Sequence, residues 1–136
     1  MKKVFSIVTA IIISTTLASC GTKSTSDTNT TKTTSTAISK ITYTKELAYF
    51  PSYDGAKLNE FTPATKKAPL ATAKYTIQNV TDTKVYEYYE SALKKDGWTI
   101  TEGQKPFSIS AKKDKHIANI IIQKSNKDVI LVVISK

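Results

Sequence analysis

The sequence contains no arginine and only one cysteine among its 136 residues. All 20 basic residues are lysines, so the chain lacks the bidentate guanidinium contacts that specific recognition of phosphate or guanine favours. We therefore expect no specific binding of nucleic acid. The single cysteine excludes a disulfide bond within the chain.

Glycine and histidine are also scarce, with four glycines and one histidine. The glycines form no phosphate-cradling loop. His116 begins a predicted strand, and no sequence neighbour supplies the nucleophile or the orienting carboxylate that a general base needs, so we interpret it as structural. One histidine cannot form a zinc site. We predict no metal, no other cofactor and no catalytic residue.

Positive charge is abundant, since the formal net charge is +9. Lys2 and Lys3 belong to an N-terminal leader, and from Cys20 onward 18 lysines face 11 acidic residues, which leaves +7. Such a surface attracts anionic lipid headgroups, acidic wall polymers or nucleic acid through screened electrostatics. The alternative is that the lysines reflect a compositional preference and form an ordinary solvated surface.

The first 20 residues have the organisation of a signal peptide. Lys2 and Lys3 supply positive charge, and the stretch 4–13 is almost entirely apolar. This stretch is too short for a comfortable membrane-spanning helix, which needs about 20 apolar residues. We therefore predict that residues 1–19 are a cleaved leader.

The leader closes with Leu17, Ala18, Ser19 and Cys20, which together closely resemble the lipobox of bacterial lipoproteins. The resemblance implies that the signal peptidase recognises Leu17, Ala18 and Ser19, that the Cys20 thiol receives diacylglycerol, and that cleavage frees Cys20. In many species a further fatty acid, such as palmitate, acylates the new amine. The resemblance also implies export and anchoring at the outer face of the cell membrane, or at an outer membrane where one exists. An ordinary secretory signal with an incidental cysteine is the alternative.

Residues 20–40 comprise Cys20 and a stretch dominated by threonine and serine. Such a composition cannot bury enough apolar surface to offset the entropy of ordering, so we predict a disordered tether. Its root-mean-square reach is roughly 25 Å, from about 5–6 Å times the square root of the residue number. An O-glycosylated stalk is the alternative, although the stretch lacks the proline of such stalks.

Residues 41–136 form the predicted globular domain, and its clearest element is a helix at about 82–96. Apolar residues recur at helical spacing in the pattern Val-x-x-x-Tyr-x-x-x-Leu-x-x-x-Gly-Trp over 85–98. Thr81 or Asp82 can cap the helix start, and the glycine supplies a left-handed stop. The pattern is similar to one found in uncharacterised small bacterial lipoproteins, and that resemblance implies no activity.

Period-two patterns predict the strands, at 73–79, 98–102, 107–112, 117–123 and 129–134. The last four are separated by short turns, which makes neighbouring strands antiparallel. We therefore predict an α+β fold, an antiparallel sheet of about five strands with the helix packed on it. Consecutive apolar residues in the last two strands indicate either a sheet covered on both faces or a face left for a partner.

Seven tyrosines are many for this length, and we interpret most of them as half-buried at the sheet surface. Tyr88 is expected to be exposed, because it lies opposite the apolar stripe of the helix. Glu87 and Glu90 are expected to pair with Lys84 and Lys94 on a solvated helix face.

These features favour a lipid-anchored, surface-exposed, non-enzymatic interaction module, whose partner is another envelope protein or an anionic wall polymer. A domain that serves only as a scaffold fits the same features. The alternative from another class is a small envelope hydrolase whose catalytic residues meet only in the fold. A concave pocket that holds His116 together with acidic or hydroxyl groups would favour the hydrolase.

Overall fold

The structure is a computed structural model that describes residues 40–136, all within one compact unit. The predicted leader at 1–19, the lipobox that ends at Cys20 and the tether up to residue 39 lie outside the described residues. In chain order the elements are β1 (Lys57–Thr62), β2 (Ala71–Ile77), α1 (Asp82–Lys95), β3 (Thr99–Gln104), β4 (Ser108–Lys113), β5 (His116–Ser125) and β6 (Asp128–Ser135).

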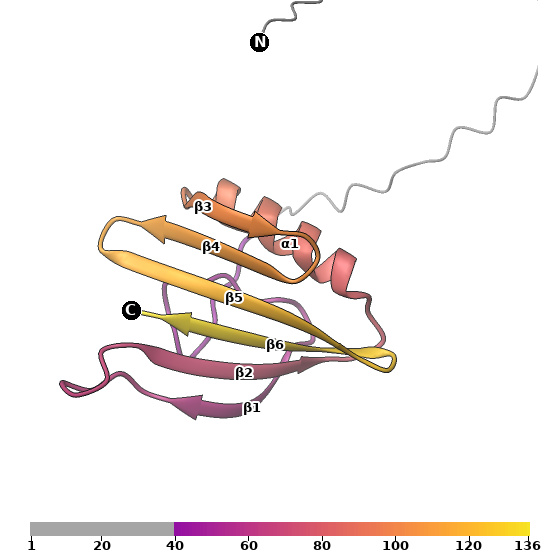
Figure 1. The fold of residues 1–136 in the computed structure, drawn as a ribbon, viewed down its shortest axis with the longest axis horizontal. Helices are drawn as coiled ribbons and strands as arrows, with labels where there is room; N and C mark the ends of the chain where they lie inside the picture. Colours follow the sequence, from indigo (N-terminus) through magenta and orange to yellow (C-terminus); the bar gives the residue numbers. More distant parts are fainter. Residues whose placement is uncertain (1–39) are drawn as a thin grey trace, which may run out of the picture. The chain divides into compact units, whose positions relative to one another are not determined.

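The six strands form one open antiparallel sheet in the order β1-β2-β6-β5-β4-β3 (Figure 1). Short connections join β1 to β2 and each successive pair from β3 to β6, whereas α1 carries the chain from β2 to the far edge at β3. The predicted α+β class, with an antiparallel sheet and one helix, is confirmed for the described residues. The expected number of about five strands was too low by one.

β1 is the strand that the sequence pattern does not predict. All six of its residues are exposed, so its sequence shows no alternation between buried and solvent positions. A register shift between Leu58 and Glu60 further disturbs the period of two. Because backbone pairing with β2 rather than burial holds this edge strand, a hydrophobic pattern cannot report it.

α1 begins and ends at the predicted capping residues. The backbone N–H of Lys84 donates to the Thr81 hydroxyl at 3.3 Å, which satisfies one of the free amides of the first turn. Lys94 and Lys95 occupy the last turn, where the helix dipole favours cations. Gly97, with φ of +81°, then turns the chain away. In residues 40–136 no helix has the length and apolarity needed to traverse a bilayer.

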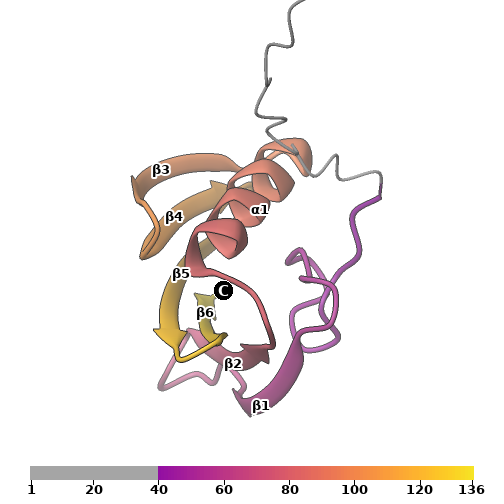
Figure 2. The same cartoon turned by 90° about the vertical axis from the view of Figure 1, so that its right-hand side faces the viewer.

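The hydrophobic core lies on one face of the sheet. In β2 and β6 every second residue is buried, and these residues belong to the same core as the apolar stripe of α1, which lies over β3, β4 and β5. The segment 41–56 lies on the same side of the sheet as α1, as Figure 2 shows. This segment adds Leu47 and Phe50 to the same core. The helix and the segment therefore share one face between them.

The other face of the sheet has no covering element among residues 40–136, and we call it the bare face (Figures 1 and 2). Ile117 and Ile121 on this face are 39% and 36% exposed. Polar residues lie among the apolar ones, as in the cross-strand row that contains Thr72, Asn119 and Ser110. Of the two arrangements predicted for the apolar strands, the one-sided arrangement is therefore observed in the described chain.

Candidate functional site

Eight lysines gather at one end of the sheet, which we call the lysine-rich end. It is built from the loop between β1 and β2, the turn between β4 and β5, the end of β6 and the last turn of α1. Backbone hydrogen bonds between Ile117 and Lys136, at 3.1 and 3.2 Å, and the pairing of Ala71 with Ser135 bring the strand ends together. The lysines are Lys66, Lys67, Lys94, Lys95, Lys112, Lys113, Lys115 and Lys136.

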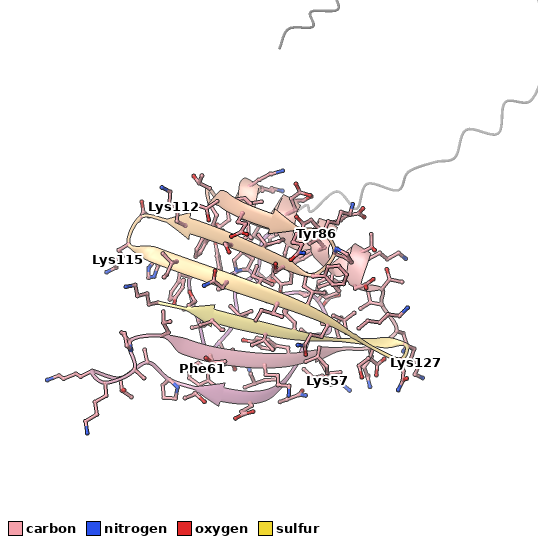
Figure 3. The ribbon with its side chains drawn as sticks, viewed as in Figure 1. Lys57, Phe61, Tyr86, Lys112, Lys115 and Lys127 are labelled. Atoms are coloured by element: carbon pink, nitrogen blue, oxygen red, sulfur yellow. The ribbon has the colours of Figure 1, made fainter. Side chains whose placement is uncertain are left out.

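The two ends of the sheet differ in charge. Three acidic residues accompany the eight lysines of the lysine-rich end, namely Glu90, Asp96 and Asp114. At the opposite end five lysines face four acidic residues, namely Lys57, Lys84, Lys105, Lys124 and Lys127 against Asp54, Asp82, Glu87 and Asp128. Figure 3 shows Lys112 and Lys115 at the first end and Lys57 and Lys127 at the second. Most of the excess positive charge of the described chain therefore lies at one end.

Ion pairs on the surface of α1 partly follow the prediction. Glu90 binds Lys94 one turn later, at 2.7 Å. Glu87 binds Lys105 at 2.7 Å, so the prediction that it pairs with Lys84 was wrong. The connection between β3 and β4 brings Lys105 to the helix. Helical spacing predicts only neighbours within the helix, so it could not predict this pair. Exposed pairs of this kind contribute little to stability.

Asp96 connects the lysine-rich end to the start of the described chain. Its carboxylate accepts hydrogen bonds from the Tyr43 hydroxyl at 2.6 Å, from Trp98 Nε1 at 3.0 Å and from Lys113 Nζ at 3.0 Å. Partial burial acts to raise the pKa of Asp96, but the hydrogen bonds from Tyr43, Lys113 and Trp98 outweigh it and hold the pKa below its usual value. The carboxylate is therefore charged at neutral pH and fully occupied as a structural anchor.

His116 lies at the lysine-rich end and is held by structural contacts. Its ring stacks on Tyr49 at a centroid distance of 3.8 Å, and its Nδ1 lies 3.0 Å from the carbonyl oxygen of Lys136. The nearby hydroxyl of Ser135 donates to the carbonyl oxygen of Ile117 at 2.6 Å rather than to the imidazole. Among residues 40–136 no hydroxyl forms a hydrogen bond with the His116 imidazole.

A pocket of about 350 Å³ opens between the segment that precedes β1 and the core beneath it, and we call it the tyrosine pocket. Its lining includes Tyr53 from the segment, Tyr75 from β2 and Tyr89 from α1. Two carboxylates, those of Glu46 and Asp54, complete it. His116 is not part of the lining, so the arrangement that would favour a hydrolase is not present in this pocket.

Burial and hydrogen bonding fix the groups inside the tyrosine pocket. The Tyr75 hydroxyl donates to Glu46 Oε2 at 3.0 Å. Burial, together with this bond to a carboxylate, raises the pKa of Tyr75 to about 12. Burial and the nearby charge of Asp54 likewise raise the pKa of Tyr53. Both phenols therefore stay neutral at physiological pH, and the Tyr75 hydroxyl binds one oxygen of the Glu46 carboxylate.

Tyr88 corrects one expectation from the helical pattern, because it is half-buried rather than exposed. Its hydroxyl donates to the carbonyl oxygen of Ser52. Its ring meets Tyr53 edge-on at 4.7 Å and Tyr89 at 5.3 Å. The segment before β1 folds against the flank of α1 that the pattern assigns to solvent, and it covers Tyr88 there.

Sequence reasoning missed Glu46 and with it the tyrosine pocket. The aromatic residues clustered near Tyr53 were the one available signal, since they indicate a packed segment without naming its partner. Within residues 40–136 no group of three or more histidine, cysteine, aspartate or glutamate side chains could hold a metal ion.

Comparison with protein-family models, with curated proteins and with solved structures finds no match.

Proposed function

We propose that this protein is a lipid-anchored, surface-exposed binding module of the bacterial envelope that holds an anionic wall polymer at its lysine-rich end. The observation that carries the proposal is the gathering of eight lysines, against three acidic residues, at one end of the sheet. The lipobox-like sequence ending at Cys20 supports the location, because two or more acyl chains anchor a protein stably.

The chemistry of lysine suits a polymer with repeated negative charges. Each ammonium acts as a point charge that needs no fixed geometry, so several lysines can engage phosphate or carboxylate groups along a flexible chain. Single contacts of this kind are weak, and affinity comes from their number. The polar row of Thr72, Asn119 and Ser110 on the bare face adds hydrogen-bonding groups for sugar or polyol units.

A charge-removal experiment tests the site. In one variant of the full chain Lys66, Lys67, Lys112 and Lys115 become glutamine. In a matched variant the same number of charges is removed at the opposite end, by glutamine at Lys57, Lys84, Lys124 and Lys127. Binding to a poly(glycerol phosphate) polymer is measured in nonionic detergent. We expect the first variant to bind roughly tenfold more weakly and the second to change by less than about twofold.

Salt and lipid controls separate the polymer from other partners. Binding should fall steeply between about 50 mM and about 500 mM salt, because the Debye length shrinks below about 10 Å over that range. Vesicles that contain anionic lipid provide the competing source of phosphate. Equal loss in the two charge variants, salt-independent binding, or binding to the vesicles but not to the polymer would each refute the proposal.

The location has its own test. Intact mass of the membrane-extracted protein should correspond to a chain that begins at Cys20 and carries diacylglycerol. A Cys20→Ser variant should lack this mass and leave the membrane fraction. A mature protein that begins elsewhere, or one without acyl mass, would contradict the lipid anchor. It would leave the polymer-binding proposal unaffected.

A further inference from the structure

The tyrosine pocket contains a carboxylate that forms no ion pair among residues 40–136. It belongs to Glu46, which is half-buried and accepts its hydrogen bond from the neutral hydroxyl of Tyr75. The other half-buried acidic residues of the described chain are matched by lysines or by backbone N–H groups. These are Glu90 and Asp96, which bind lysines, and Asp82 and Asp128, which accept from backbone N–H groups.

Some of the hydroxyl donors around the tyrosine pocket are already committed. The Thr44 hydroxyl donates to the carbonyl oxygen of Leu47 at 2.9 Å. The hydroxyls of Thr42 and Ser52 bind each other at 2.6 Å. The carboxylates of Glu46 and Asp54 in the lining can only accept hydrogen bonds, so they favour a ligand that donates. An ammonium group donates to a carboxylate and also carries the opposite charge, which a neutral sugar lacks.

Aromatic rings are a second feature of the pocket that attracts a positively charged ligand. Tyr53 and Tyr75 line the pocket, and the electron-rich faces of such rings attract cations. Tyr53 packs against Tyr88 in a T-shaped arrangement, with 4.7 Å between the ring centroids. The volume of about 350 Å³ lies in the range of small-molecule sites.

We infer that the tyrosine pocket binds a small organic cation, with the ammonium group against Glu46 and beside the rings of Tyr53 and Tyr75. Asp54 at the same lining adds negative charge that attracts the ligand. Lys45 also lines the pocket, and it is exposed and forms no ion pair with Glu46 in the described chain. No lysine of the lysine-rich end lines the pocket, so the site requires neither that end nor its polymer.

Calorimetric titration of the full chain in nonionic detergent tests the inference. The probes are choline, ethanolamine and putrescine, and the controls are dimethylbutanol, which is the uncharged isostere of choline, and glucose. We expect at least one ammonium probe to bind, and dimethylbutanol to bind roughly tenfold more weakly or not at all.

Matched variants locate the site. Glu46→Gln removes the charge but keeps an acceptor for Tyr75, so we expect the fold to remain and ammonium binding to weaken roughly tenfold. Tyr53→Leu should also weaken it. Glu60→Gln, an exposed glutamate on β1, serves as the control and should change binding by less than about twofold. Thermal unfolding of each variant checks that folding is intact.

Several results would overturn the inference. These are no binding of any ammonium probe up to about 10 mM, equal binding of choline and dimethylbutanol, preferential binding of glucose, or full binding by folded Glu46→Gln. The variant that lacks Lys66, Lys67, Lys112 and Lys115 should bind the ammonium probe normally. Failure of the pocket and failure of polymer binding are therefore distinguishable.

Discussion

The lysine-rich end and the tyrosine pocket attract opposite charges and are built in different ways. At the lysine-rich end the lysines come from the loop between β1 and β2, the end of β4 and the turn after it, the end of β6 and the last turn of α1, and all of them except Lys113 are exposed. In the tyrosine pocket the rings of Tyr75 and Tyr89 belong to the core, at 5% and 1% exposure. The first region suits a flexible polymer and the second a compact ligand of defined shape.

The two regions also differ in what a substitution should disturb. Long exposed lysines contribute little to folding, so their loss should change binding and leave stability nearly unaltered. The pocket residues Tyr75 and Tyr89 belong to the core, so truncation of either should change stability first. The free energy of unfolding of variants in the two regions can therefore test this difference without any ligand.

The largest effect is expected at Tyr89. Truncation by Tyr89→Ala leaves a cavity where Phe50 packs at a ring distance of 5.7 Å and where Tyr53 and Tyr88 also meet the ring. We expect the free energy of unfolding to fall by about 3–5 kcal/mol, measured by urea denaturation. Tyr89→Phe keeps the ring and should cost about 1 kcal/mol. Comparable losses in both variants would show that packing does not hold the pocket.

Local signals explain why α1 could be predicted from the sequence. Its cap at Thr81, its apolar stripe and its stop at Gly97 lie within a single short stretch and need no distant partner. The four strands from β3 to β6 were also recognisable, because short turns separate them. β1 was not predicted, because all of its residues are exposed and its sequence shows no alternation of apolar and polar positions.

Distant contacts explain why neither site could be predicted. Glu46 meets Tyr75 only after the segment before β1 has folded back over the sheet. Tyr88 is half-buried for the same reason, because Ser52 and Tyr53 cover it. Each lysine of the lysine-rich end is visible in the sequence, but their gathering depends on strand order and register, which the local pattern does not fix.

An intermediate effect is expected at Asp96, which links the two regions through Tyr43, a pocket residue, and Lys113. Asp96→Asn removes the charge from a carboxyl that three donors stabilise, and we expect a loss of about 1–2 kcal/mol at pH 7. Because the pKa of Asp96 is lowered in the folded protein, its contribution is present above the unfolded pKa of about 3.9 and disappears as pH falls through the folded value.

Urea denaturation at several pH values tests whether the contribution of Asp96 to stability disappears in acid. The difference between the native sequence and Asp96→Asn should be largest near neutral pH and shrink in acid. Asp114→Asn, which removes an exposed carboxylate from the same end, should show a much smaller difference at every pH. A difference between native and Asp96→Asn that stays constant with pH would contradict the role of the charge.

The smallest effect on stability is expected at the lysine-rich end itself. Replacing Lys66, Lys67, Lys112 and Lys115 with glutamine removes exposed charges that form no ion pair among residues 40–136. We expect the free energy of unfolding to change by less than about 0.5 kcal/mol, with any gain at low salt vanishing at high salt as repulsion between lysines is screened. A loss of stability that persists in high salt would mean that these lysines support the fold, and weaker polymer binding by this variant could then no longer be assigned to charge alone.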